Sequence, residues 1–213
     1  MGGRGSSSGS ASFGVANSSS SEYSSEAFFA AAVNSIASDG FYADDFKQSK
    51  SDVPYLLNNP DSLSINKRLV INAYTSNVAY RLNENLRFGK NDTKTKIFER
   101  TLNHSLDSVA NYKGEVRRAM TLKNAGDVLK KYRENVGGKI KYNSFLSTTA
   151  ERSLSKSFTS ENDSWNVIYV IRSKNGKRIK AYSNAPDENE VLFKSGSTFK
   201  IKRVDGNIVY LEE

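Results

Sequence analysis

The spacing of apolar residues changes along the chain, from a helical repeat in the first half to strand-like runs in the second. Phe29, Val33 and Ile36 show the three- and four-residue spacing of one helix face. The same spacing recurs further along and predicts helices over 26–37, 63–86, 94–109 and 125–134. The first half is therefore expected to be mainly helical.

Residues 166–171 form a continuous β-branched and apolar run, which is typical of a central strand covered on both faces. Further strands are expected over 114–120, 145–149, 178–182, 190–193, 198–204 and 207–211. Asp205-Gly206, between the last two, is a strong hairpin signal. Helices followed by antiparallel-looking strands predict an α+β domain.

The first 22 residues are rich in glycine and serine and lack apolar periodicity, so we expect a flexible tail over 1–22. The chain has 37% hydrophobic and 11% aromatic residues, enough for one core, and we expect a single domain over 23–213. No apolar stretch predicts a secretory signal or a membrane span. The location is left open: cytoplasmic, virion-associated or delivered by another component.

The amino-acid composition argues against a metal site and against a nucleic-acid groove. The chain has no cysteine and one histidine, so we expect no metal site. That residue, His104, lies in an amphipathic helical stretch and is expected at the surface or near a helix end. The net charge of +8 favours anionic partners, but lysine and arginine are dispersed without interleaved aromatics. A nucleic-acid groove is therefore not expected.

Two glutamates, Glu188 and Glu190, lie one residue apart at the start of a predicted apolar strand. Carboxylates this close raise one another's pKa, although an E-x-E alone also fits a solvated strand edge. Upstream, the hydroxyl-rich segment 147–149 follows a strand-like Phe-Leu pair and is suited to orienting a carboxylate. Arg117 lies in the short predicted strand before it.

In order and spacing, Arg117, the 147–149 segment Ser-Thr-Thr and the 188–190 segment Glu-Asn-Glu resemble the clostridial-toxin-like mono-ADP-ribosyltransferases, whose pattern is Arg, S-T-S and E-x-E. The stretch Y-R-L-N-E-N-L-R at 80–87 is similar to that family's I-N-x-x-L-R motif. Residues 191–201 are similar to its closing E-V-L-x-x-x-G-S-x-F-x-I stretch. The resemblance covers roughly residues 70–210.

The chain departs from the family pattern in two places. Thr149 replaces the last serine of S-T-S and keeps the hydroxyl. Val116 stands where the family usually has an aromatic residue, so the choice of Arg117 over Arg118 rests on position alone.

The resemblance implies two packed, mainly antiparallel sheets that form an NAD-binding core. It implies NAD as a substrate, Glu190 as the invariant glutamate that stabilises an oxocarbenium-like transition state, and Ser147 as its hydrogen-bond partner. Arg117 is expected to bind the dinucleotide phosphates. In this family, a glutamate at the position of Glu188 accompanies modification of arginine. The reason is that the guanidinium of the target arginine must lose a proton before it attacks the ribose.

The resemblance extends the expected site. Residues expected to line the NAD site with Ser147 are Thr148, Thr149, Arg87, Asn83 and Phe158. Tyr182, in the loop before the glutamate pair, is expected to touch the target protein together with Glu188. The expected protein is a monomeric bacterial toxin, effector or phage-associated enzyme that also hydrolyses NAD.

Two alternatives stay open. The opening MGGRGSSSG resembles the starts of some phage proteins, which suits an inactive transferase-fold structural protein of a phage particle. A degenerate domain is expected to have lost Arg117, Ser147 or Glu190, and all three are present. A nucleic-acid-modifying transferase is the other alternative, and it is expected to have glutamine at position 188, where this chain has Glu188.

Overall fold

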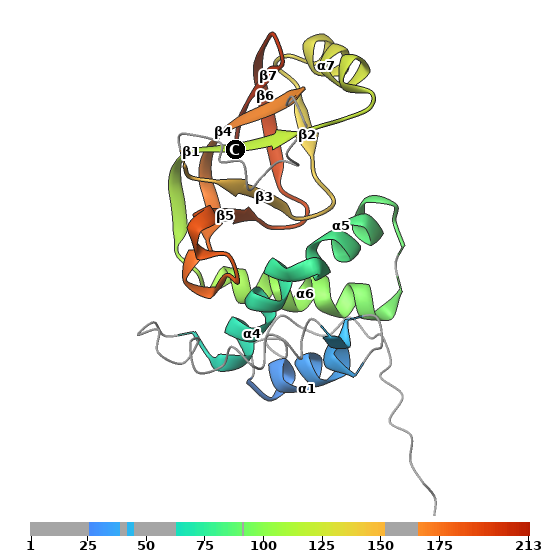
Figure 1. The fold of residues 1–213 in the computed structure, drawn as a ribbon, viewed down its shortest axis with the longest axis vertical. Helices are drawn as coiled ribbons and strands as arrows, with labels where there is room; N and C mark the ends of the chain where they lie inside the picture. Colours follow the sequence, from blue (N-terminus) through green and yellow to red (C-terminus); the bar gives the residue numbers. More distant parts are fainter. Residues whose placement is uncertain (1–25, 39–41, 45–62, 91, 152–165) are drawn as a thin grey trace, which may run out of the picture.

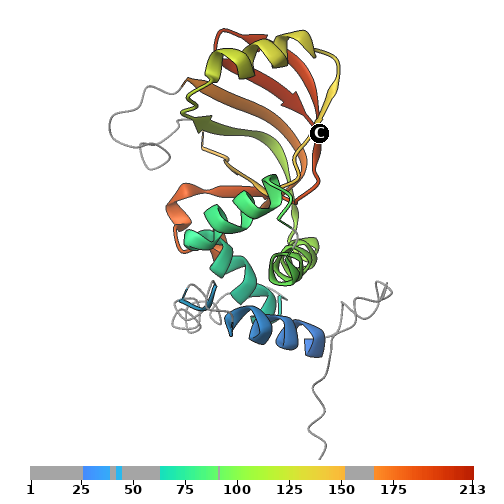
Figure 2. The same cartoon turned by 90° about the vertical axis from the view of Figure 1, so that its right-hand side faces the viewer.

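The computed structural model describes residues 26–38, 42–44, 63–90, 92–151 and 166–213. The tail expected over 1–22 and Phe158 lie outside these ranges. Figure 1 shows the described residues as a helical layer below a twisted sheet, and Figure 2 shows the same two parts from the side.

The helical layer comes from the first half of the chain. Its helices are α1 (Glu26–Ala37), α4 (Ile65–Ala73), α5 (Ala79–Arg87) and α6 (Thr93–Asp107). The helix expected over 63–86 is interrupted by a π-helical turn, Tyr74–Val78, in which Ser76 leaves helical geometry. A further helix, α7 (Ala125–Glu134), lies apart from this layer and contacts β6.

The seven strands of the described ranges belong to one hydrogen-bonded sheet. They are β1 (Asn111–Met120), β2 (Lys139–Lys141), β3 (Leu146–Thr149), β4 (Val167–Arg178), β5 (Glu190–Phe193), β6 (Thr198–Asp205) and β7 (Ile208–Glu212), in the order β1-β3-β5-β4-β7-β6-β2. Only β4 and β7 pair in parallel, and β1 also pairs with β4. The expected α+β class, with helices mostly in the first half, is confirmed; the two expected sheet layers are parts of this one sheet.

The strand expected over 178–182 does not form. β4 runs from Val167 to Arg178, and Lys180–Tyr182 is a 3₁₀ turn. Ile179 and Tyr182, three residues apart, are both buried in the core of the helical layer. A strand would send residues three apart to opposite faces, whereas a 3₁₀ turn places both on the same side.

Two apolar cores meet at β5. Leu192 packs in the core of the helical layer, while Val191 and Phe193 pack in the core between the sheet and α7. All four β5 residues are buried, including the charged Glu190 at its first position. The strand is therefore covered on both faces, and its polar first residue lies where helices and sheet come together.

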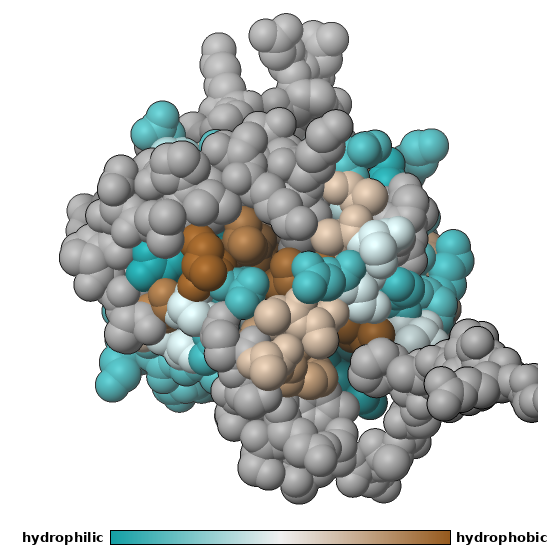
Figure 3. Space-filling view, turned by 90° about the horizontal axis from the view of Figure 1, so that it is seen from below, coloured by the Kyte–Doolittle hydropathy of each residue, from teal (hydrophilic) through white to brown (hydrophobic). Residues whose placement is uncertain are grey.

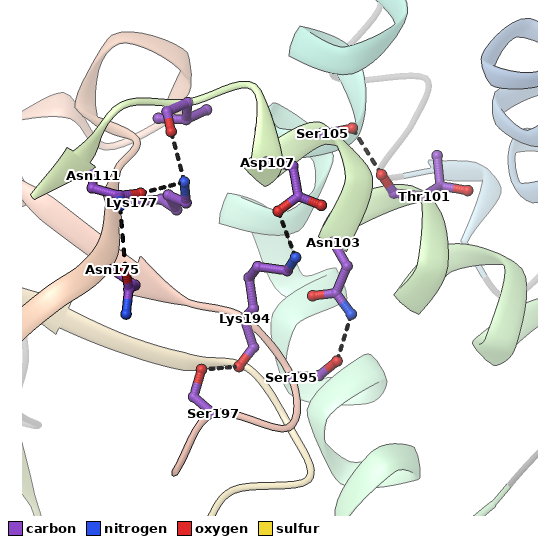
Figure 4. Close-up of polar contacts among 11 residues, drawn as sticks. Thr101, Asn103, Ser105, Asp107, Asn111, Asn175, Lys177, Lys194, Ser195 and Ser197 are labelled. Atoms are coloured by element: carbon purple, nitrogen blue, oxygen red, sulfur yellow. Dashed lines mark hydrogen bonds and ion pairs between the residues drawn. The ribbon is translucent and has the colours of Figure 1, made fainter. Parts of the chain in front are cut away.

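Polar contacts join the end of α6 to the sheet, as Figure 4 shows. Lys194 Nζ lies 2.6 Å from Asp107 Oδ1. The buried Lys177 donates from Nζ to Val109 O at 2.8 Å and to Asn111 Oδ1 at 2.6 Å. These bonds satisfy a cation that burial would otherwise penalise, and they fix the helical layer against β4 and β5.

Seen from below, the helical end of the described chain presents apolar residues among hydrophilic ones (Figure 3). No helix within the described ranges is long and apolar enough to cross a membrane.

Candidate active site

The centre of the site is the carboxyl group of Glu190. The residue as a whole is 5% exposed. β3 and β5 pair antiparallel, with Thr149 opposite Glu190 and Ser147 opposite Leu192. Ser147 and Thr149 share one face of β3, because side chains alternate along a strand. The hydroxyl of Ser147 is therefore diagonal to Glu190, and it forms a hydrogen bond with the carboxyl.

A chain of hydrogen bonds connects this carboxyl to the helical layer. Asn83 Nδ2 on α5 donates to Tyr74 Oη at 2.8 Å, and Tyr74 Oη lies 3.3 Å from Ser147 Oγ. Either of these two hydroxyls can be the donor. Asn83 Oδ1 also accepts from the backbone N–H of Phe145 at 3.0 Å, just before β3. The π-helical turn thus ties β3 and Glu190 to α5.

Burial dominates the electrostatics of the site. It raises the pKa of Glu190 to about 7; the nearby charge of Glu188 raises it too, whereas the Ser147 hydrogen bond and the cation of Arg118 lower it. Burial, together with the charge of Glu190, raises the pKa of Tyr74 to about 12. Tyr74 therefore keeps its proton at neutral pH and stays a hydrogen-bond donor.

Arg117 was expected at the site, and the structure places its neighbour Arg118 against Ser147. Arg118 Nη1 donates to Ser147 O at 2.8 Å, and its Nε is buried without a hydrogen-bond partner in the described chain. Arg117 Nη2 instead lies 2.7 Å from Glu115 Oε1 in a solvent-exposed ion pair. Neighbouring strand residues point to opposite faces, so the two arginines leave β1 on different sides. Arg117 is paired with Thr149, whereas Arg118 reaches the backbone carbonyl of Ser147.

Glu188 ends a short 3₁₀ turn, Pro186–Glu188, and its backbone carbonyl accepts from Thr149 Oγ1 at 2.7 Å. Burial raises the pKa of its half-buried carboxyl. Asn189, between the two glutamates, has a left-handed backbone with φ of 48°. Asparagine tolerates this conformation better than most residues, which allows the sharp turn into β5.

Thr148 and Tyr182 were expected at the site, but the structure buries both side chains elsewhere. Thr148 is fully buried on the other face of β3, where its hydroxyl donates to Val191 O at 2.6 Å. Tyr182 is 5% exposed and packs in the core of the helical layer. A side chain buried there cannot touch an incoming protein without a rearrangement.

Arg87 is exposed at the end of α5, one helical turn beyond Asn83 and so on the same side of that helix. Tyr74 is the member of the site that sequence reasoning missed, because it fitted the apolar face of a helix. Its hydroxyl was the available signal, since a buried tyrosine usually needs a hydrogen-bond partner.

Within the described ranges, no group of three or more His, Cys, Asp and Glu side chains could hold a metal. His104 lies in the last turn of α6, with its ring centroid 6.4 Å from that of Phe29. The side chains gathered at the site are carboxylates, hydroxyls and a guanidinium.

A family model described as ADP-ribosyltransferase exoenzyme matches residues 43–210, which include every side chain of this site. The chain belongs to the ADP-ribosyltransferase exoenzyme family. A Mycobacterium avium (strain 104) protein, provisionally named NAD(+)–arginine ADP-ribosyltransferase Mav, is 32% identical over 134 residues. That match covers 62% of this chain and 15% of the relative, so the chain spans only a small part of the curated relative's length.

Solved structures share the family fold. The eukaryotic mono-ADP-ribosyltransferase ART2.2 has a TM-score of 0.70 at 17% identity, over 91% of this chain and 86% of that one. Exoenzyme S of Pseudomonas aeruginosa, solved with human 14-3-3 protein beta and bound to carba-NAD, has a TM-score of 0.65 at 16% identity, over 87% and 88%. The arrangement of helices and sheet is thus that of mono-ADP-ribosyltransferases.

The raised pKa of Glu190 predicts a pH-dependent stability. Between pH 4.5, the ordinary pKa of a glutamate, and about 7, the folded state keeps a proton that the unfolded chain has released. The free energy of unfolding should therefore fall as pH rises through this window, by up to about 3 kcal/mol. Urea unfolding at pH 5, 6, 7 and 8 should show a flatter profile for Glu190→Gln. Identical profiles for the two proteins would contradict this prediction.

Proposed function

We propose that this chain is an NAD-dependent mono-ADP-ribosyltransferase that modifies arginine on a target protein. The observation that carries the proposal is the buried Glu190 carboxyl, hydrogen-bonded through Ser147 to Tyr74, with Glu188 two residues away. Transfer of ADP-ribose breaks the bond between nicotinamide and the ribose carbon, and nicotinamide leaves with the bonding electrons. The ribose then carries the positive charge of an oxocarbenium ion.

Glu190 is suited to stabilising that charge. A carboxylate at a desolvated position acts on a nearby cation more strongly than one in water. The cationic nicotinamide ring of NAD would also favour the ionised carboxylate, which burial alone disfavours. Tyr74 and Ser147 restrict the rotamers of Glu190, so the carboxylate needs little reorganisation when the charge develops.

Arg118 is proposed to bind the dinucleotide phosphates in the role first expected of Arg117. Its guanidinium donates to Ser147 O, and its Nε is a buried donor that finds no partner among the described residues. A phosphate oxygen would supply the missing acceptor, and the planar guanidinium fork matches phosphate geometry. Thr149 and Asn83 flank the same region, and Arg87 follows Asn83 on α5.

Glu188 is proposed to take the proton of the acceptor. A guanidinium is protonated at neutral pH and must lose a proton before it attacks the ribose carbon. Burial raises the pKa of the Glu188 carboxyl, which makes it a better base than an exposed glutamate. The name of the Mycobacterium avium relative, an arginine ADP-ribosyltransferase, supports the same acceptor.

Water is proposed to compete as an acceptor, which would give NAD hydrolysis as a side reaction. We place the chain among toxin-like or effector-like enzymes that act on a protein, or among phage-associated enzymes, and we expect it to act as a monomer. The inactive structural protein remains the alternative; it would show neither transfer nor NAD hydrolysis.

Arg118→Lys should weaken NAD binding about tenfold to a hundredfold, because a charge-assisted bond contributes roughly 1.5 to 3 kcal/mol. Arg117→Lys is the matched control, and it should change the dissociation constant less than about threefold, since its partner is the exposed Glu115. Calorimetry at constant salt, in a Glu190→Gln background that leaves NAD intact, measures both. A larger loss for Arg117→Lys would restore the original assignment and contradict this one.

Glu188→Gln should lower transfer to agmatine, a small guanidine, at least about a hundredfold by removing the general base. NAD hydrolysis should stay within about fivefold of the parent, because water needs less help once the oxocarbenium forms. Labelled NAD measures both rates in one reaction, and mass spectrometry of a modified protein locates the acceptor. Equal loss of both activities, or modification of asparagine, cysteine or a nucleobase, would contradict the arginine assignment.

A further inference from the structure

The segment that carries Glu188 has little regular structure of its own. Between the 3₁₀ turn ending at Tyr182 and the start of β5, its regular part is the short turn Pro186–Glu188. The Glu188 carboxyl makes no hydrogen bond or ion pair within the described ranges. Its position must therefore come from whatever holds the backbone of this segment.

The start of the segment is attached to α4 by a cluster of side-chain hydrogen bonds. Asn72 Nδ2 donates to Tyr182 O at 2.9 Å and to Asn184 Oδ1 at 2.8 Å. Asn184 Nδ2 donates back to Asn72 O at 3.3 Å. The backbone N–H of Asn184 donates to Thr75 Oγ1 at 2.9 Å, and that hydroxyl donates to Asn72 O at 2.8 Å. Asn72, Thr75 and Asn184 are called the α4 clamp below.

One member of the α4 clamp, Asn72, destabilises the helix in which it lies. Asn72 is 1% exposed, lies among apolar neighbours of α4, and leaves its Oδ1 without a hydrogen-bond partner in the described chain. Asparagine is a poor helix former, and an unsatisfied buried amide oxygen is destabilising. An apolar residue at this position would stabilise the helix more. What Asn72 contributes instead is its hydrogen bonds to Tyr182 and Asn184.

The other end of the segment is held as well. Asn189 Oδ1 accepts from Arg178 Nε at 3.0 Å and from Arg178 Nη2 at 2.7 Å. Asn189 Nδ2 donates to Glu151 Oε1 at 2.8 Å. Glu188 therefore lies between two fixed points, one on α4 and one at the ends of β3 and β4.

The same few residues of the helical layer reach both glutamates. Tyr74 connects to Glu190 through Ser147, while Asn72 and Thr75, on either side of it, hold the segment of Glu188. Thr75 lies in the π-helical turn, a distortion often found at functional sites. Because neighbouring residues of the chain hold both, a shift of the segment relative to them would change the distance between the two carboxylates.

On the basis of the proposed function, we propose that the α4 clamp positions Glu188 relative to Glu190 and so sets how the reaction divides between transfer to arginine and hydrolysis by water. Asn72, Thr75 and Asn184 are positioning residues that act through Glu188. Displacement of a catalytic group by about 1 Å costs up to a hundredfold in rate. Hydrolysis depends on Glu190, whose contacts the clamp does not include, and should be spared.

Two matched pairs of variants test the clamp. Thr75→Val removes the hydroxyl at nearly constant shape, and Thr75→Ser keeps it. Asn184→Ala removes the loop side chain of the clamp, and Asn175→Ala is the control, an exposed asparagine whose side-chain bond is to Asn111. Initial rates of agmatine modification and of nicotinamide release, each as a function of agmatine and NAD concentration, give the transfer-to-hydrolysis ratio and both KM values.

Thr75→Val and Asn184→Ala should lower the transfer-to-hydrolysis ratio about tenfold and raise the KM for agmatine, with the KM for NAD within about twofold of the parent. Thr75→Ser and Asn175→Ala should keep the parental ratio. An active parent whose ratio is the same in all four variants, or variants that lose both rates equally, would overturn the clamp alone. A parent that neither releases nicotinamide nor modifies agmatine would overturn the proposed function and, with it, the clamp.

Discussion

The burial of one carboxyl group between two apolar cores is the constraint on which the rest of this site depends. Glu190 begins a strand whose next residues pack against helices on one face and against the sheet core on the other. Ionising this carboxyl without compensation would be costly. The Ser147 hydroxyl and the Arg118 guanidinium lower that cost, while leaving the pKa of Glu190 raised to about 7. A developing positive charge beside it would be strongly stabilised.

The helical layer contributes directly to this site. The break between α4 and α5 is a π-helical turn, and it brings Tyr74 to Ser147 while Asn83 on α5 holds the Tyr74 hydroxyl. Two residues of α4 and the turn, Asn72 and Thr75, hold the segment before Glu188. Family membership rests on residues 43–210, a range that spans both the helical layer and the sheet.

Local signals predicted several of the elements and the segments of the site, but not β2 or the break between α4 and α5. Apolar spacing located α1, α6 and α7, and the order of arginine, hydroxyls and paired glutamates located β1, β3 and β5. The rest depended on tertiary packing. Sequence cannot say which of two adjacent arginines reaches a neighbouring strand; Arg117 was expected at the site, and the structure places the Arg118 guanidinium against the Ser147 carbonyl. Likewise, Tyr182 is buried because Ile179 and Tyr182 both pack on the helices, which a strand would not allow.

Glu190 is the group on which all turnover is expected to depend. The most direct measurement is nicotinamide release from NAD by the parent and by Glu190→Gln, with circular dichroism to confirm that both proteins are folded. The parent should release nicotinamide, and Glu190→Gln, which keeps the shape of the side chain but cannot ionise, should lose the activity almost completely. A folded Glu190→Gln protein that hydrolyses NAD within about tenfold of the parent rate, less than removal of one key electrostatic group costs, would contradict the central role of this carboxylate.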